Sequence, residues 1–195
     1  MKSSAYILAF LIGACGLGAG YQFPSDGTSK SPNAKWSIVC KSTIDDPESS
    51  HRLILMGADR SSRELRRFDR SCDVLWSADS AHVAITDWLG SNLSDIFVYA
   101  ITNSQSGTSL RDLFPTGAIP DSEIRGHCYF EATKWLDSQR LRIRVFGHTD
   151  QTSSHEFDYA YVFDISSQRF EKLTAKTPNK SLQATATAPS VLTGP

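Results

Sequence analysis

Three histidines and one cysteine in the C-terminal half have side chains of the kinds that hold metal ions. His127 and Cys128 are adjacent, and His148 and His155 flank a short polar segment. Imidazole nitrogens and thiolates are preferred zinc ligands. However, adjacent residues of a strand point to opposite faces of a sheet, and these four lack the spacing of zinc motifs. We therefore expect no metal site here, but surface histidines and a buried or disulfide-bonded cysteine.

A row of arginines could instead bind an anion. Arg140, Arg142 and Arg144 alternate with three aliphatic residues, so in a strand the three guanidinium groups share one face. A single charged strand face is more often a solvated surface on which Asp and Glu of a neighbouring strand pair with the arginines. We predict this second arrangement.

Residues 87–95 are rich in oxygen-bearing side chains, which are the ligands of calcium. The segment runs from Asp87 to Asp95 and includes Asn92 and Ser94. It lacks the Asp-x-Asp-x-Asp-Gly spacing that places oxygens around the ion. The segment is therefore predicted to be a polar hairpin loop.

The cysteines limit the redox chemistry of the chain. The four of them are Cys15, Cys40, Cys72 and Cys128, and no two have CxxC spacing. This excludes a zinc ribbon and a thioredoxin-like motif. In an oxidising compartment Cys40, Cys72 and Cys128 allow one disulfide and one free thiol, and both Cys40–Cys72 and Cys72–Cys128 are open.

The sequence lacks the motifs of the common enzyme classes. It contains no G-x-S-x-G, H-E-x-x-H, P-loop or G-x-G-x-x-G pattern. We therefore assign no catalytic, cofactor-binding or metal-binding residue and expect no cofactor. The formal net charge is -1, so no global positive field would attract nucleic acid. A protein or a cell-envelope component is the expected partner.

A repeated strand pattern supplies the elements that carry these residues. Each copy contains apolar strands and a polar turn, and the copies open at three tryptophans: Trp36, Trp76 and Trp135. An apolar strand then leads through a polar turn to a further strand, beginning at residues 54, 96 and 161. Repeats of this length indicate propellers, solenoids or arrays.

The second copy carries the most specific signal. Trp76-Ser77-Ala78-Asp79-Ser80, followed by an apolar strand, resembles the W-S-P-D-G signature of TolB-like and related β-propeller blades. The resemblance covers about residues 35–174 and implies an all-β fold of antiparallel, blade-like repeats. Propellers close with about 4–8 blades, so three copies are too few for a standard closed ring. An open stack, a rearranged sandwich and an oligomer that completes the ring all remain open.

One short segment supports two interpretations. Ser109-Leu110-Arg111-Asp112 fits a capping box at the start of a helix. The repeat alignment instead places these residues in a strand. We follow the repeat and predict no helix in the body of the chain, with a long loop over residues 115–126.

The N-terminus is a targeting segment. Ile12-Gly13-Ala14-Cys15 ends an apolar stretch and resembles the lipobox of bacterial lipoproteins, which implies that Cys15 is lipidated. A cleaved signal peptide and a retained membrane anchor over residues 5–23 also remain open. All three alternatives place the folded part outside the cytoplasm, in the periplasm or secreted, with membrane contact only through the N-terminus.

The predicted organisation has four parts. A signal peptide or anchor spans residues 1–20, a linker 21–34, a β-repeat domain 35–174 and a disordered tail 175–195. We expect an exported binding or interaction module of unknown ligand rather than an enzyme. The alternative is an extracytoplasmic hydrolase with its site in the loops at residues 115–127 and 147–155.

Overall fold

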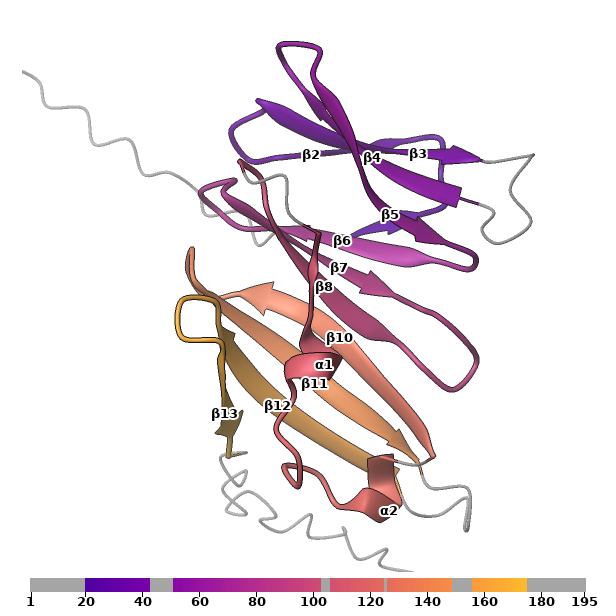
Figure 1. The fold of residues 1–195 in the computed structure, drawn as a ribbon, viewed down its shortest axis with the longest axis vertical. Coiled ribbons are helices and arrows are strands. Elements are labelled where there is room, and N and C mark those ends of the chain that lie inside the picture. Colours follow the sequence, from indigo (N-terminus) through magenta and orange to yellow (C-terminus); the bar gives the residue numbers. More distant parts are fainter. Residues whose placement is uncertain (1–19, 43–50, 103–105, 125, 149–155, 175–195) are drawn as a thin grey trace, which may run out of the picture.

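The chain folds into three antiparallel sheets that follow one another along the long axis of the molecule (Figure 1). The computed structural model describes residues 20–42, 51–102, 106–124, 126–148 and 156–174. Within these residues, strands dominate and the helices are two single turns. The predicted all-β, antiparallel, blade-like fold class is confirmed.

The first and third sheets are meanders of consecutive strands. The first has the order β2-β3-β4-β5, with bounds Thr28–Lys30, Trp36–Ser42, His51–Gly57 and Ser62–Phe68. The second has the order β1-β6-β7-β8-β9, with bounds Tyr21–Phe23, Cys72–Trp76, His82–Asp87, Asp95–Ala100 and Thr108–Ser109. In this sheet, β1 pairs with the first strand of the meander β6 to β9. The third has the order β10-β11-β12-β13, with bounds His127–Trp135, Arg140–His148, Glu156–Asp164 and Arg169–Leu173. Helices α1 (Leu110–Leu113) and α2 (Asp121–Ile124) connect the second sheet to the third.

The second sheet lies in the middle and is buried on both faces. In β7, Val83 and Ile85 belong to the core shared with the first sheet, and Ala84 belongs to the core shared with the third. Successive residues of a strand point to opposite faces, so a strand between two cores has an uninterrupted apolar sequence. Two hydrophobic cores therefore hold the three sheets together.

Two of the three repeat tryptophans occupy equivalent positions, as predicted. Trp76 ends β6 and Trp135 ends β10. The indole Nε1 of Trp76 donates to Ser29 Oγ of the first sheet at 2.9 Å. That of Trp135 donates to the Leu75 carbonyl of the second sheet at 3.0 Å. Each tryptophan thus ties its own sheet to the preceding one.

The first repeat begins earlier than the sequence predicted. Residues 21–34, expected to be a linker, contain β1, β2 and the turn after β2. Phe23 at the end of β1 is fully buried, and β1 pairs with β6 of the second sheet. The Gly, Ser and Pro content that is typical of linkers is equally typical of tight turns, and here it belongs to turns.

Trp36 is consequently not the equivalent of Trp76. The Ser31 amide donates to the Trp36 carbonyl at 2.9 Å, just as the Ser77 amide donates to the His82 carbonyl at 3.0 Å. The two serine hydroxyls repeat these contacts at 3.0 Å each. Trp36 therefore starts β3 at the place where His82 starts β7, and the prediction that it opens a copy is wrong.

Residues 110–113 are helical, so the strand predicted there is also wrong, although Ser109 itself ends β9. Ser109 Oγ accepts from the Asp112 amide at 3.1 Å, as an N-cap does. Buried Asp95 accepts from Ser109 Oγ at 2.6 Å and from the Arg111 amide at 3.0 Å. This carboxylate fixes the first turn of α1, and the local capping signal outweighs the repeat.

The predicted loop at residues 115–126 is also partly ordered by burial. It contains α2, and Ile119 is 2% exposed in the core between the second and third sheets. Tyr159 Oη of β12 donates to Glu123 Oε2 of α2 at 2.9 Å. Across the residues for which the fold is described, no helix has the length and apolar character to span a membrane.

Candidate binding site

Five half-buried rings gather where the outer face of the third sheet meets the loop after β7. We call them the aromatic strip: Trp88, His127, Tyr129, Phe146 and His148. The outer face of this sheet is the one turned away from the core. Strand alternation places Tyr129 and Phe146 on this face, because the residues next to them in sequence are fully buried on the other face. These neighbours are Phe130 and Val145.

Strand register brings the rings together. Tyr129 of β10 lies opposite Phe146 of β11, and their ring centroids are 5.2 Å apart. His127 lies opposite His148, with rings stacked at 4.1 Å. Trp88 extends the line from the second sheet, 6.1 Å from Tyr129. The strip thus crosses from one sheet to the next.

Hydrogen bonds hold the rings in place. Trp88 Nε1 donates to Asp73 Oδ2 at 2.6 Å. The Tyr129 hydroxyl donates to the Ser91 carbonyl, and its oxygen lies 3.1 Å from His127 Nδ1. Rings that are positioned before a ligand arrives lose less side-chain entropy on binding.

The loop at residues 87–95 supports the strip rather than a calcium ion. Its Asn92 carbonyl accepts from the Cys128 amide at 3.0 Å, which joins the loop to β10. Its two aspartates point elsewhere: Asp87 forms an ion pair with Arg66, and Asp95 caps α1. The predicted polar hairpin loop is therefore present, and its oxygens do not surround one point.

The charges beside the strip are paired with one another. Arg144 donates through Nε and one terminal nitrogen to Asp158 at 2.9 and 2.8 Å, and lies 3.7 Å from Glu131. Its guanidinium carbon is 4.0 Å from the centre of the Phe146 ring. The hydrogen bond from Arg144 lowers the pKa of Asp158. Burial raises the pKa of Glu131, against the opposing effect of Arg144.

Two of the three arginines that were candidates for an anion site form ion pairs with carboxylates. Arg144 pairs with carboxylates of both neighbouring strands, as predicted for a solvated face, and Arg140 pairs with Asp137 at 2.7 Å. Arg142 lies opposite Lys134 and Val162 in register. The three arginines therefore do not converge on one anion site.

The four candidate metal ligands are separated. His127 and His148 meet in the strip, but Cys128 is 1% exposed and belongs to the core on the other face. His155 lies outside the described residues. Where the structure describes the chain, no three His, Cys, Asp or Glu side chains form a group suited to a metal ion.

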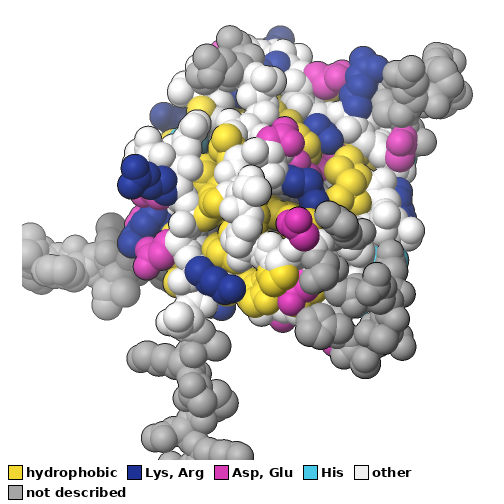
Figure 2. All heavy atoms as spheres, turned by 60° about the horizontal axis from the view of Figure 1, so that its bottom comes forward, with side chains coloured by type: hydrophobic (Ala, Val, Ile, Leu, Met, Phe, Trp, Pro, Cys, Tyr) yellow, Lys and Arg dark blue, Asp and Glu magenta, His cyan; other side chains and the backbone are white. Residues whose placement is uncertain are grey.

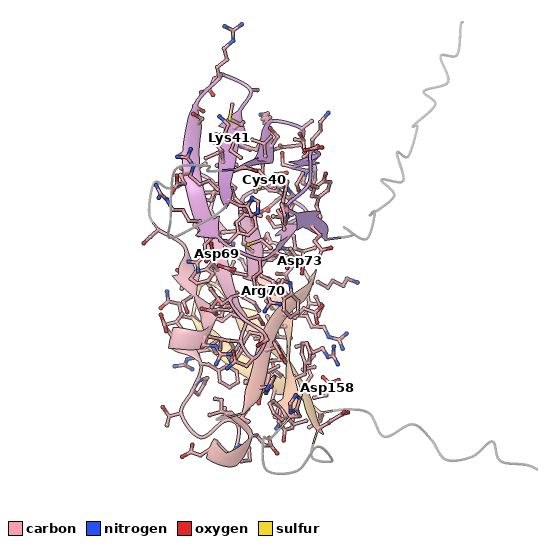
Figure 3. The ribbon with its side chains drawn as sticks, turned by 90° about the vertical axis from the view of Figure 1, so that its right-hand side faces the viewer. Cys40, Lys41, Asp69, Arg70, Asp73 and Asp158 are labelled. Atoms are coloured by element: carbon pink, nitrogen blue, oxygen red, sulfur yellow. The ribbon has the colours of Figure 1, made fainter. Side chains whose placement is uncertain are left out.

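The cysteines of the body are separate thiols, so both expected disulfide pairings are absent. Cys40, Cys72 and Cys128 are free and lie in the first, second and third sheets. Figure 3 labels Cys40 in the first sheet, Asp73 in the second and Asp158 in the third, at successive heights along the molecule. Burial raises the pKa of all three thiols, which makes them poor nucleophiles. Cys15 lies outside the described residues.

The loops proposed for the alternative hydrolase lie beside α2 and the strip. Tyr159 bonds with Glu123, and Tyr129 with His127. Neither pair joins a serine or cysteine nucleophile to a base, which covalent hydrolysis requires. Residues 149–155 lie outside the described part.

Two cavities and one apolar surface lie elsewhere. A cavity of about 260 Å³ opens between the first and second sheets, with the lining Trp36, Leu55, Ser61, Ser62, Arg63, Ile101 and Thr102. A second, of about 90 Å³, lies between the second and third sheets. Both are smaller than the ~300 Å³ at which ligand pockets usually begin.

The apolar surface consists of residues at the edge of the core between the second and third sheets. Figure 2 shows hydrophobic side chains gathered at the lower end of the molecule, with charged groups around them. The half-buried hydrophobic residues that pack against this core are Leu113, Phe114, Ala132, Tyr159, Ile165 and Phe170. Phe114 packs edge-on against Phe130, Tyr161 and Phe170 at 5.0–5.1 Å. These rings stabilise the attachment of α1 to the third sheet.

Sequence reasoning missed the strip, although part of its signal was present. The period of two that places Arg140, Arg142 and Arg144 on one face also places Phe146 there. Tyr129 alternates with Phe130 in the same way. Trp88 carried no such signal, because its position depends on how the second sheet packs beside the third.

Comparisons with known proteins add a likeness of fold. No protein-family model matches the chain, and no curated protein matches it. Among solved structures, it is similar to a variant of AtxE2 isopeptidase with astexin3-dC4 bound, with a TM-score of 0.53 and 10% identity over 82% of this chain. The apo form of AtxE2 isopeptidase gives a TM-score of 0.50 at 11% identity over 76% of this chain. The chain spans about a third of the length of these isopeptidase chains, 31% and 28%.

Proposed function

We propose that this chain is an exported binding module and that the aromatic strip is its binding surface. The observation that carries the proposal is the group of five half-buried rings held by strand register and hydrogen bonds. Aromatic side chains and arginine are the residues that most often supply binding energy at recognition surfaces. The partner we propose is a protein or another component of the cell envelope.

The location of the module is part of the proposal. The lipobox-like sequence ending at Cys15 and the TolB-like signature at Trp76 both support an extracytoplasmic protein. A lipid anchor at Cys15 would hold the β-rich body, which begins at β1, close to the membrane. Attachment to a membrane would come from the N-terminus, because the net charge of -1 offers no electrostatic attraction to anionic lipid.

Binding through the strip is tested by sedimentation with envelope fragments. The full chain carrying Cys15→Ser, which cannot be lipidated, is mixed with isolated bacterial envelopes and centrifuged. We expect this chain to pellet, and we expect the additional pair Tyr129→Ala and Phe146→Ala to leave most of it in the supernatant. Leu136→Ala, which alters a 43%-exposed side chain in the turn after the far end of β10, should pellet normally. Equal pelleting of the strip variant and its control would contradict the proposal.

Export is tested separately by cell fractionation. The full-length chain with Cys15 should be processed and recovered with membranes of a bacterial host, because a lipid chain would hold it there. Cys15→Ser, combined with Tyr129→Ala and Phe146→Ala so that the strip cannot retain the chain on the envelope, should release it to the soluble extracytoplasmic fraction or leave it unprocessed. If both forms stay in the cytoplasm with an intact N-terminus, the first 20 residues are not a targeting segment.

A further inference from the structure

We propose that the aromatic strip binds a neutral, extended glycan whose sugar rings are joined by β-1,4 linkages. The inference rests on the proposed function and names the chemistry of its ligand. Sugar rings in such a chain expose C–H groups on both faces, and these groups pack against the negative faces of aromatic rings.

The shape of the strip favours a chain over a small molecule. Neither the cavity lined by Trp36 and Arg63 nor the one lined by His82 and Phe163 includes a residue of the strip. A small molecule needs a concave site that buries most of its surface, whereas a polymer can lie along an open face. The centroids of Trp88, Tyr129 and Phe146 follow one another at 6.1 and 5.2 Å, close to the ~5 Å spacing of neighbouring strands. One sugar unit of an extended chain advances by a similar length. The ring planes are inclined to one another by 47° and 32°, and Arg144 lies over one face of Phe146, so a chain that meets successive rings would have to twist along the strip.

The charges around the strip favour a neutral ligand. Arg144 is bound to Asp158 through two hydrogen bonds and lies close to Glu131. A nucleic acid or an acidic peptide would need unpaired cations beside the rings, because neutralised phosphates supply most of the binding energy in nucleic-acid complexes. The exposed cations Lys134 and Arg142 lie opposite each other further along the sheet, beyond Arg144. The affinity of the strip for the glycan should therefore depend little on salt concentration.

The rim of the strip offers acceptors for hydroxyl groups. Asp73 accepts from Trp88 Nε1 at 2.6 Å, and Asp158 accepts from Arg144. Each ionised carboxylate has about four acceptor positions, so these contacts leave others open. A ligand rich in hydroxyl groups matches an aromatic platform with carboxylates along its edge.

The experiment is a titration of the purified chain, carrying Cys15→Ser, with soluble β-1,4-linked hexasaccharides of glucose and of N-acetylglucosamine. Binding is followed by calorimetry and by tryptophan fluorescence at two salt concentrations. We expect at least one hexasaccharide to bind, with little change between the salt concentrations. Tyr129→Ala and Phe146→Ala should each weaken binding about tenfold, since each removes one stacked ring. Tyr129→Phe, which keeps the ring and loses the hydroxyl, should retain most of the affinity, and Leu136→Ala all of it. Melting curves of each variant show that it is folded.

Three results would overturn the glycan proposal. The first is that neither hexasaccharide binds at millimolar concentration. The second is that binding is unchanged in Tyr129→Ala and Phe146→Ala. The third is that the strip mediates self-association, seen as a concentration-dependent increase in mass by light scattering that both variants abolish. In the first and third cases, strip-dependent pelleting with envelopes would still support the broader binding function, so the two proposals fail independently.

Discussion

Arg66→Ala should destabilise the protein by about 3–5 kcal/mol, because it leaves a buried carboxylate without its partner. Arg66 Nε lies 2.7 Å from Asp87 Oδ2, and the Asp87 side chain is 1% exposed. The guanidinium carbon also lies 3.6 Å from the centre of the Phe97 ring. Arg66 belongs to the first sheet, whereas Asp87 and Phe97 belong to the second, so this one side chain joins two layers. Urea unfolding measures the loss.

The adjacent arginine provides a matched control. Arg67 pairs with Glu64 at 2.8 Å, but both side chains are solvent-accessible, at 51% and 35%. Arg67→Ala should therefore cost about 0–1 kcal/mol. Similar losses for the two variants would show that the Arg66–Asp87 pair does not hold the sheets together.

The pH dependence of Arg66→Ala follows from the state of Asp87. Burial raises the pKa of Asp87, although Arg66 acts to lower it. A carboxyl whose pKa is higher in the folded state makes folding more favourable as pH falls, because the folded protein takes up the proton first. Without Arg66 this pKa should rise further. The loss of stability should therefore shrink between about pH 7 and pH 4. A loss that grows over this range would contradict the assignment.

Trp135→Ala should cost on the order of 3–5 kcal/mol, as expected for a large ring removed from a core. Trp135 is 8% exposed, packs in the core between the second and third sheets, and stacks on His82 at 6.0 Å. Trp135→Phe keeps an aromatic ring and loses the bond to the Leu75 carbonyl, so it should cost roughly 1–3 kcal/mol. Trp76→Ala should cost less than Trp135→Ala, because Trp76 is only half-buried. Thermal or urea unfolding of the three variants checks this order. A loss of unfolding free energy below about 1 kcal/mol for Trp135→Ala would contradict the assignment of Trp135 to the core.

The sequence was most predictive where period and packing agree. Strict alternation from Arg140 to Val145 predicted β11 and its charged outer face, and the cross-strand carboxylates are where that interpretation required them. Apolar runs such as Val83 to Ile85 predicted strands buried on both faces. In these elements local preference and the core select the same structure.

The sequence failed where two local signals conflict. At residues 21–34, turn-forming residues were interpreted as a linker, because β1 and β2 have three residues each and too few side chains to show a period. At Ser109, the repeat was preferred over a capping signal that the buried Asp95 reinforces from another strand. The binding surface was harder still. Trp88 and Tyr129 meet only after the second and third sheets pack, and no spacing in the sequence encodes that distance.

The most direct test is to map the ligand onto the chain. Amide chemical shifts are recorded by NMR while the N-acetylglucosamine hexasaccharide and the glucose hexasaccharide are titrated into the labelled protein. The strip predicts that the largest shifts fall on Trp88, Ser91, Tyr129 and Phe146, with little change around the cavity lined by Trp36 and Arg63. Saturable shifts centred on that cavity, or spectra that neither sugar changes, would contradict the glycan-binding account.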